Sequence, residues 1–217
     1  MCGIIGSFSK NKIIELSKIN SARGNKTYSL TVLSKEGYVI SCDKQIGEFN
    51  QQVFEKVKDI NIVEPYYILH IQSPTKVTKL DKETIHPAKQ HSGYTETIDY
   101  LWHNGMIIER NMNIIKEKYS YDSNWDTGLI LKMVTEDIDT LEEIEGSFGC
   151  LLLKDNNFYI FRNNIVPMYY DDDLNISSTE FENSTKLNSN IVYDIDLKNK
   201  KLNYFKQFKN EHNPYKF

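Results

Sequence analysis

The chain has 217 residues, 26% of them charged and 40% hydrophobic, and a formal net charge of −4. This composition is typical of a globular protein and excludes extensive disorder. A mildly acidic chain gains nothing from phosphate attraction, which argues against a nucleic-acid partner. No apolar run approaches the roughly 20 residues of a membrane helix, and the N-terminus is too short and too uncharged for a secretory signal. We therefore expect no membrane and no nucleic-acid partner.

The first half of the chain predicts short strands alternating with helices. Residues 2–9 form an apolar strand, and residues 11–22 carry isoleucine and leucine at helical spacing. Gly24 follows this helix at the position where a left-handed cap is common. Further along, periodicity and turn residues predict strands at 38–42 and 66–72, a helix at 50–60 and a loop at 75–93.

The second half begins with a buried strand and two helices and then becomes rich in strands. Residues 97–103 predict a strand that Asn104-Gly105, a common turn dipeptide, is expected to end. The remaining segments predict helices at 113–119 and 127–134, a turn at 141–145, and strands at 149–154, 158–162, 167–170, 175–178, 191–197 and 202–208. This order predicts sheets packed on each other with helices outside. No glycine-rich phosphate loop is present, so no nucleotide site is expected.

The three cysteines, Cys2, Cys42 and Cys150, are far apart and odd in number. They form neither a disulfide framework nor a zinc site, so we expect reduced thiols and a cytoplasmic protein. Cys42 and Cys150 lie in apolar runs and are expected to be small buried hydrophobic residues. Three histidines lack metal-ligand spacing and are expected at the surface or in loops, with no metal and no cofactor: His86, His91 and His212.

Cys2 differs from the other cysteines because only Met1 precedes it. A small second residue normally lets the initiator methionine be removed, which would leave Cys2 with both a thiol and a free α-amine. The amine has an ordinary pKa of about 7.7–8.0 and the thiol one of about 8.5, close to neutral pH, where an efficient general base should lie. One residue would thus supply nucleophile and base. Taken alone, a cysteine at this position is better explained by chance than by a catalytic role.

Two further features are suited to acyl transfer. The side-chain amide of Asn104 beside the unhindered N–H of Gly105 is a suitable pair of donors for a developing oxyanion, although Asn-Gly is also an ordinary hairpin turn. Asp126, at the expected start of a helix, is suited either to bind a substrate ammonium group or to cap the helix. Each feature alone favours the simpler structural role.

Taken together, these residues resemble the motifs of class II glutamine amidotransferase domains, which occur in asparagine synthetase, in the amidotransferase of purine synthesis and in glucosamine-phosphate synthase. The opening Met1-Cys2-Gly3-Ile4-Ile5-Gly6 resembles the start of these domains. Further segments follow in the family's order as far as about residue 180: Arg23-Gly24, His70-Ile71-Gln72-Ser73-Pro74-Thr75, His103-Asn104-Gly105, Asp126-Thr127, Glu145-Gly146-Ser147-Phe148-Gly149, Phe161-Arg162 with Pro167-Met168-Tyr169-Tyr170, and Ser177-Ser178-Thr179-Glu180.

The resemblance implies a reaction in which Cys2 attacks the side-chain amide of glutamine, with its own α-amine as base through a water molecule. Asn104 and Gly105 would form the oxyanion hole, and Asp126 would hold the α-ammonium group of glutamine. Ammonia leaves, and water then hydrolyses the γ-glutamyl thioester to glutamate. The implied fold is α+β, the four-layer αββα sandwich of N-terminal-nucleophile hydrolases.

The resemblance also places Arg23, Gln72 and Thr75 among the substrate-binding residues. The chain departs from the family at Gln72, where the family has an arginine that clamps the α-carboxylate of glutamine by a bidentate contact. Three alternatives follow: another cation replaces this arginine, glutamine binding is weak, or the substrate lacks the carboxylate.

The resemblance implies a single glutaminase domain over residues 1–217, without the synthase domain that normally follows. Released ammonia would then need a separate synthase subunit or a small acceptor that enters the site directly. Two alternative functions remain: an N-terminal-cysteine amidase that acts on a different amide, and an inactive binding or scaffold protein that has this fold.

Overall fold

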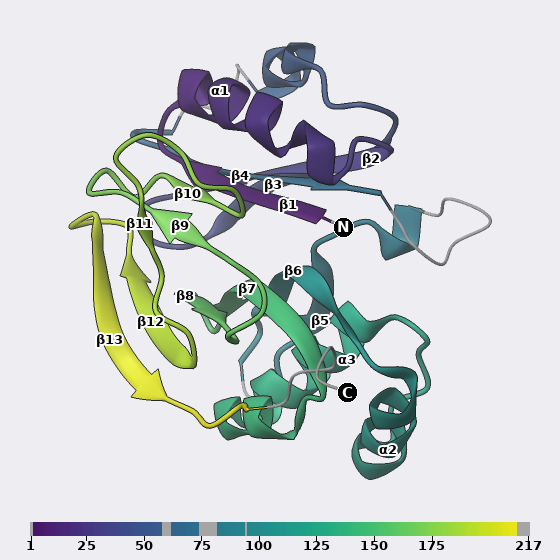
Figure 1. Cartoon of the computed structure of the whole chain (residues 1–217). Coiled ribbons are helices and arrows are strands. Elements are labelled where there is room, and N and C mark those ends of the chain that lie inside the picture. The colour runs from purple at the N-terminus through teal and green to yellow at the C-terminus, as the bar shows by residue number, and fades with distance from the viewer. Residues whose placement is uncertain (1, 58–61, 74–81, 94, 212–217) are drawn as a thin grey trace. The chain divides into compact units, whose positions relative to one another are not determined.

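The computed structural model describes residues 2–57, 62–73, 82–93 and 95–211. The chain divides into two compact units, and each is built around an antiparallel sheet (Figure 1). The first unit comprises Met1–His86, Met168–Leu187 and Asp196–Leu202, and the second comprises Pro87–Pro167, Asn188–Ile195 and Asn203–Phe217. No helix among the described residues is long and apolar enough to cross a membrane.

The sheet of the first unit has seven strands in the order β11-β9-β10-β1-β4-β2-β3. β1 lies in the interior of this order and pairs with β4 from Cys2, opposite Gln72, to Ser7, opposite Tyr67. The ladder therefore fixes the N-terminal segment, a part of many chains that is poorly ordered unless a sheet holds it. The strands are β1 (Cys2–Ser7), β2 (Thr27–Leu33), β3 (Val39–Ile46), β4 (Tyr66–Gln72), β9 (Tyr169–Tyr170), β10 (Ile176–Ser177) and β11 (Thr185–Lys186).

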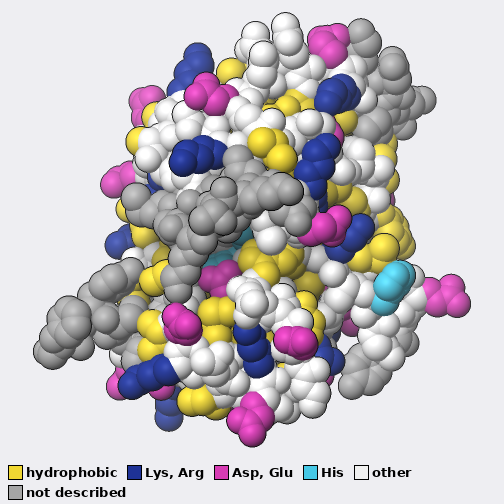
Figure 2. Space-filling model, turned by 90° about the vertical axis from the view of Figure 1, so that its right-hand side faces the viewer, with side chains coloured by type: hydrophobic (Ala, Val, Ile, Leu, Met, Phe, Trp, Pro, Cys, Tyr) yellow, Lys and Arg dark blue, Asp and Glu magenta, His cyan; other side chains and the backbone are white. Residues whose placement is uncertain are grey.

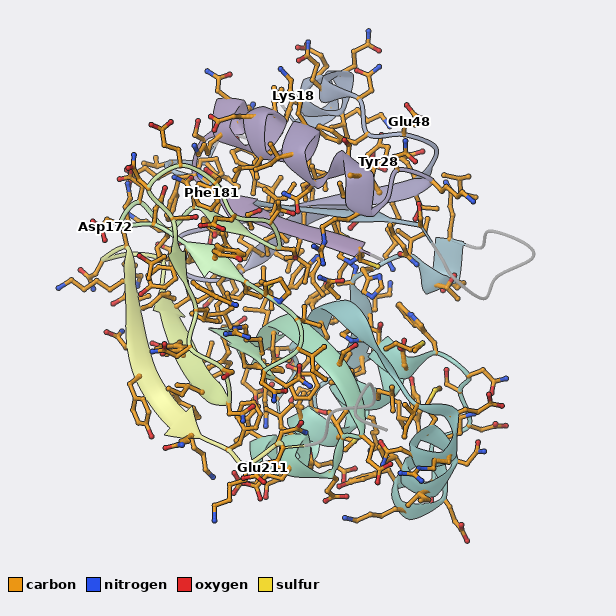
Figure 3. All side chains as sticks on the ribbon, viewed as in Figure 1. Lys18, Tyr28, Glu48, Asp172, Phe181 and Glu211 are labelled. Atoms are coloured by element: carbon orange, nitrogen blue, oxygen red, sulfur yellow. The ribbon has the colours of Figure 1, made fainter. Side chains whose placement is uncertain are left out.

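One helix, α1 (Lys10–Asn20), covers one face of this sheet (Figure 1). The helix begins after Ser9, whose hydroxyl accepts a backbone N–H of the first turn at 3.3 Å. Ile13 and Leu16, three residues apart on one side of the helix, are fully buried in the apolar cluster of this unit. Phe181, labelled in Figure 3, belongs to the same cluster.

The opposite face of the same sheet is polar in its central strands. Directly paired residues of neighbouring strands share a face, so the register places Cys2, Gln72 and Thr27 side by side on this face. The next row contains His70 and Ser29. All but Cys2 of these side chains are buried, so the sheet carries a covered row of hydrogen-bonding groups next to Cys2.

The sheet of the second unit has six strands in the order β13-β12-β8-β7-β6-β5. They are β5 (Ala88–His91), β6 (Ile98–Ile107), β7 (Gly146–Lys154), β8 (Asn157–Arg162), β12 (Ile191–Asp196) and β13 (Lys201–Gln207). Helix α3 (Asp126–Glu136) packs against β5 and β6, and helix α2 (Glu109–Tyr119) packs against α3.

On the face shown in Figure 2, basic and acidic side chains are interspersed, in keeping with a net charge of only −4.

Several elements differ from the sequence prediction. β2 was not predicted, although small hydroxyl residues alternate with larger apolar ones over residues 27–32, which is a usable strand signal. β5 lies within the segment predicted as a loop, because its short polar sequence has no apolar period and is held by pairing with β6. The predicted helix at residues 50–60 is a 3-10 helix at Gln51–Val57, and residues 58–60 lie outside the described residues.

Two local predictions in the first unit are wrong. Gly24 has φ 169° and ψ 143°, which is extended backbone and not a left-handed cap. Cys42 is exposed and not buried, because β3 is the edge strand of its sheet and has a neighbouring strand on one side only. Cys150, on the interior strand β7, is fully buried as predicted.

Candidate active site

Cys2 is the first residue of β1, and its backbone is held by Arg23. The Arg23 Nε donates a hydrogen bond of 2.9 Å to the carbonyl oxygen of Cys2. Arg23 ends a 3-10 helix, Ser21–Arg23, that directly follows α1 and returns the chain to the start of β1. Burial lowers the pKa of Arg23, whereas the negative charges that Cys2 and Tyr169 can carry act in the opposite direction. The guanidinium is thus placed to orient the residue that bears the thiol.

Gln72 is the residue directly opposite Cys2 in the β1–β4 ladder, and its side chain is only 7% exposed. Its Oε1 lies 3.0 Å from Nδ1 of His86. The His86 ring stacks on that of His70, with centroids 4.0 Å apart and an angle of 26° between the ring planes. His86 lies in a loop, as predicted, but it is only 3% exposed and is therefore not at the surface.

In the second unit, Asn104-Gly105 lies inside β6 and does not end it, so the predicted turn is wrong. Asn104 is paired with Gly149 of β7, and Gly105 with Phe148. Gly105 has a φ of +147°, and a Cβ atom at this position would overlap the backbone carbonyl oxygen of Ser147. Glycine alone tolerates both conditions, and the strand continues through a position where another residue would stop it.

His103, next to this pair, joins β6 to β7 and α3. Its ring is 2% exposed, with Nε2 3.5 Å from the carbonyl oxygen of Ser147 and Nδ1 3.2 Å from the hydroxyl of Thr127. Burial lowers the pKa of His103, and the nearby Asp126 carboxylate opposes this effect. A neutral ring donates Nε2–H to the carbonyl and accepts at Nδ1 from the hydroxyl.

Asp126 is the first residue of α3, and its carboxylate is fixed by backbone N–H groups. Oδ1 accepts from the Thr127 N–H at 2.8 Å, and Oδ2 accepts from the Ile107 N–H at 3.4 Å. A carboxylate is favoured at a helix N-terminus, where the helix dipole is positive. The side chain is still 22% exposed, so the structure gives Asp126 a role at the helix start and leaves part of the carboxylate accessible.

Because His103 is buried, we expect the free energy of unfolding to depend on pH. Because its pKa is lowered in the native state, the unfolded chain takes up this proton at a higher pH than the folded chain. The unfolded state thus binds more protons as the pH falls through about 6.5, and the free energy of unfolding should decrease there. We expect urea unfolding at about pH 7.5 and 5.5 to show this loss.

His103→Gln should reduce that difference in unfolding free energy between the two pH values. His91→Gln is the matched control, because the His91 side chain is exposed at the end of β5. Equal pH dependence in the wild type and in His103→Gln would show that another group is responsible.

The predicted site residues thus form two local groups, one in each unit. The first contains Cys2, Arg23 and Gln72, and the second contains Asn104, Gly105 and Asp126. Thr75 and His212 lie outside the described residues. Among the residues that the structure describes, no three or more His, Cys, Asp or Glu side chains are grouped to hold a metal ion.

The prediction did not assign a role to two buried histidines next to these groups, His86 and His103. His103 belongs to the His103-Asn104-Gly105 motif, so its place beside Asn104 and Gly105 was available from the sequence. For His86 the single signal is its neighbour Ile85, which is 1% exposed. One apolar neighbour does not separate a buried histidine from an exposed one.

The fold confirms the predicted α+β class: the described residues form two antiparallel sheets with a few helices. No protein-family model matches the chain, and no curated protein matches its sequence. The similarity that was found is one of fold.

Two solved structures have this fold. One is the glutamine phosphoribosylpyrophosphate amidotransferase from B. subtilis, with a TM-score of 0.63 and 15% identity over 94% of this chain and 49% of that chain. The other is described as the allosteric regulatory enzyme of purine biosynthesis, with a TM-score of 0.65 and 14% identity over 94% of this chain and 48% of that chain. The resemblance to glutamine amidotransferases thus extends to the fold, and the chain spans about half the length of either structure.

Proposed function

We propose that this chain is a glutaminase unit of the class II amidotransferase type, with Cys2 as nucleophile. The observation that carries the proposal is the position of Cys2 at the start of an interior strand, with its carbonyl oxygen held by a hydrogen bond from Arg23. A thiol on a backbone held in this way loses less conformational freedom when it attacks an amide carbon. The fold is shared with a solved amidotransferase, and this similarity supports an amide as the substrate of Cys2.

In the proposed reaction the Cys2 thiol transfers its proton, through a water molecule, to the α-amine of the same residue. The sulfur attacks the amide carbon, and the negative charge that develops on the amide oxygen is stabilised by the Asn104 side-chain amide and the Gly105 N–H. The α-ammonium returns the proton to the leaving nitrogen, so that ammonia departs and a γ-glutamyl thioester remains. Water then hydrolyses the thioester, giving glutamate and the free thiol.

The substrate in this proposal is glutamine, with its α-ammonium group at the Asp126 carboxylate. Ammonia is passed to a separate synthase subunit or to a small acceptor. The second candidate is an N-terminal-cysteine amidase for another amide. It is favoured by one observation, that the side chain opposite Cys2 is the neutral Gln72.

The test is to incubate the purified protein with glutamine and to measure glutamate and ammonia together, in equal amounts if the side-chain amide is hydrolysed. Intact mass before and after reaction with an electrophilic glutamine analogue reports removal of Met1 and reactivity of Cys2 in one measurement. A covalent adduct on the protein without Met1 supports the proposal. Retained Met1 with no adduct and no product contradicts it.

Arg23 supplies a further prediction. Arg23→Gln removes the Nε–H that holds the Cys2 carbonyl, and one hydrogen bond from a charged group contributes about 1.5–3 kcal/mol. We therefore expect kcat/KM for glutamine hydrolysis to fall by roughly 10- to 100-fold.

The matched control is Arg110→Gln. Arg110 pairs with Glu145 at 2.8 Å on the surface, where its side chain is 72% exposed, and such pairs contribute little. Its kcat/KM should stay close to the wild-type value. Similar losses in the two variants would show that Arg23 has no special role at Cys2.

A further inference from the structure

The side chain beside Cys2 decides which chemical group can be bound next to the nucleophile. Cys2 and Gln72 are directly paired, so their Cβ atoms lie on one face of the sheet at about 4.5–5.5 Å. Gln72 is the last residue of β4 and is 7% exposed. A substrate that places its amide carbon at the Cys2 thiol therefore has a neighbouring group close to the Gln72 carboxamide.

His86 fixes which end of that carboxamide is presented. A carboxamide oxygen can only accept, so the 3.0 Å contact between Gln72 Oε1 and His86 Nδ1 places the proton on the histidine nitrogen. The stacked ring of His70, at 4.0 Å, limits rotation of the His86 ring. With Oε1 engaged, the remaining hydrogen-bonding function of Gln72 is its NH₂ donor, and the side-chain hydrogen bond of Gln72 found among the described residues is the one to His86.

A neutral NH₂ donor suits a neutral acceptor better than a carboxylate. An anion buried against a carboxamide loses hydration without gaining a counterion, whereas an amide carbonyl accepts the same N–H bond at far lower desolvation cost. The positive charge of Arg23 is directed through Nε to the Cys2 carbonyl oxygen. Within the described residues, no ion pair or hydrogen bond joins a cationic side chain to the Gln72 side chain.

We propose that the substrate is a glutamine whose α-carboxyl group is in amide linkage, as in the N-terminal glutamine of a peptide, and that Gln72 selects it. The Gln72 NH₂ donates to the α-carbonyl oxygen of this residue, and His86 is the positioning residue that orients Gln72. The inference rests on the proposed function, including the assignment of the free α-ammonium group to Asp126. The reaction is the same thioester hydrolysis, and its product is an N-terminal glutamate.

The experiment compares kcat/KM of the full chain for free glutamine, glutamine α-amide and the dipeptide Gln-Gly. Mass spectrometry of the products separates hydrolysis to a glutamyl product from spontaneous cyclisation, and a blank without protein corrects the ammonia signal. We expect both amide-linked substrates to exceed free glutamine by roughly 10-fold or more. An Nα-acetylated glutamine α-amide should be the poorest substrate, because it has no ammonium group.

Three variants test whether Gln72 and His86 determine the preference for amide-linked substrates. Gln72→Arg should reverse the preference toward free glutamine, because a guanidinium binds a carboxylate by two parallel bonds. Gln72→Met keeps the length of the side chain without its donor and should remove the preference. His86→Phe keeps an aromatic ring against His70 but lacks Nδ1, and should reduce the preference while the melting temperature changes little.

The outcomes separate the two proposals. Hydrolysis that favours free glutamine overturns this inference and leaves the glutaminase proposal standing. A preference for amide-linked substrates that is unchanged in Gln72→Arg overturns the role of Gln72. If no substrate is hydrolysed and no electrophilic analogue labels Cys2, the proposed function fails, and this inference fails with it.

Discussion

Cys2→Ala is expected to lower the rate of glutamate and ammonia release by on the order of 10⁴-fold or more, because it removes the atom that forms the thioester. Alanine is also small enough to permit removal of Met1, so the α-amine is kept and only the sulfur is lost. The substitution deletes one partly exposed sulfur at the start of β1, so the midpoint of urea unfolding should change little. The measurement is the initial rate of glutamate formation.

Cys42→Ala is the matched control for this prediction. Cys42 is an exposed cysteine on the edge strand β3, and its removal should leave the rate unchanged. An electrophilic glutamine analogue should label the Cys42→Ala protein at Cys2 and leave Cys2→Ala unlabelled. A Cys2→Ala protein with activity within 10-fold of the wild type would contradict the assignment of Cys2 as nucleophile.

Gly105→Ala is expected to destabilise the second unit by more than about 4 kcal/mol, or to prevent folding. The new Cβ would overlap the carbonyl oxygen of Ser147, and a backbone group in a paired strand cannot rotate away as a flexible side chain can. The φ of +147° adds a strain of about 1–3 kcal/mol for any residue with a Cβ atom. Urea unfolding followed by tryptophan fluorescence measures the effect, because Trp102 is fully buried on the same strand.

Two other glycines allow the effect of the steric overlap to be separated from that of the backbone strain. Gly47 has a φ of +126° but no atom within 4 Å of the added Cβ, so Gly47→Ala should show the strain alone, about 1–3 kcal/mol. A Cβ at Gly93 would also meet nothing within 4 Å, and Gly93→Ala should stay within about 0.5 kcal/mol of the wild type. A loss in Gly105→Ala no larger than that in Gly47→Ala would show that the strand accommodates the side chain.

The elements that were predicted correctly carry their signal in a short stretch of sequence. β4 is an unbroken run of strand-forming residues, Tyr66–Gln72, and every one of them is buried. In α1 the spacing of Ile13 and Leu16 defines the buried side of the helix. In each case the residues that determine the element are close neighbours along the chain, so periodicity alone was sufficient.

The candidate site was predictable to the extent that its residues stand in family order. Cys2, Asn104, Gly105 and Asp126 were identified from motif resemblance, and the fold of the chain matches that of the amidotransferases. The hydrogen bond from Arg23 to the Cys2 carbonyl depends on how α1 and its following 3-10 helix return to β1. That return is a property of packing, which motif order does not specify.

The sequence by itself predicted the α+β class of fold and a strand that begins at Cys2, and the family resemblance identified the neutral Gln72 as a departure at a substrate-binding position. Only the tertiary structure decided that β6 continues through Gly105, that His86 is buried against His70, and that Cys42 is exposed. The physical reason is common to all three. Strand pairing, ring stacking and an edge position depend on partners distant in the chain, and local periodicity carries no information about those partners.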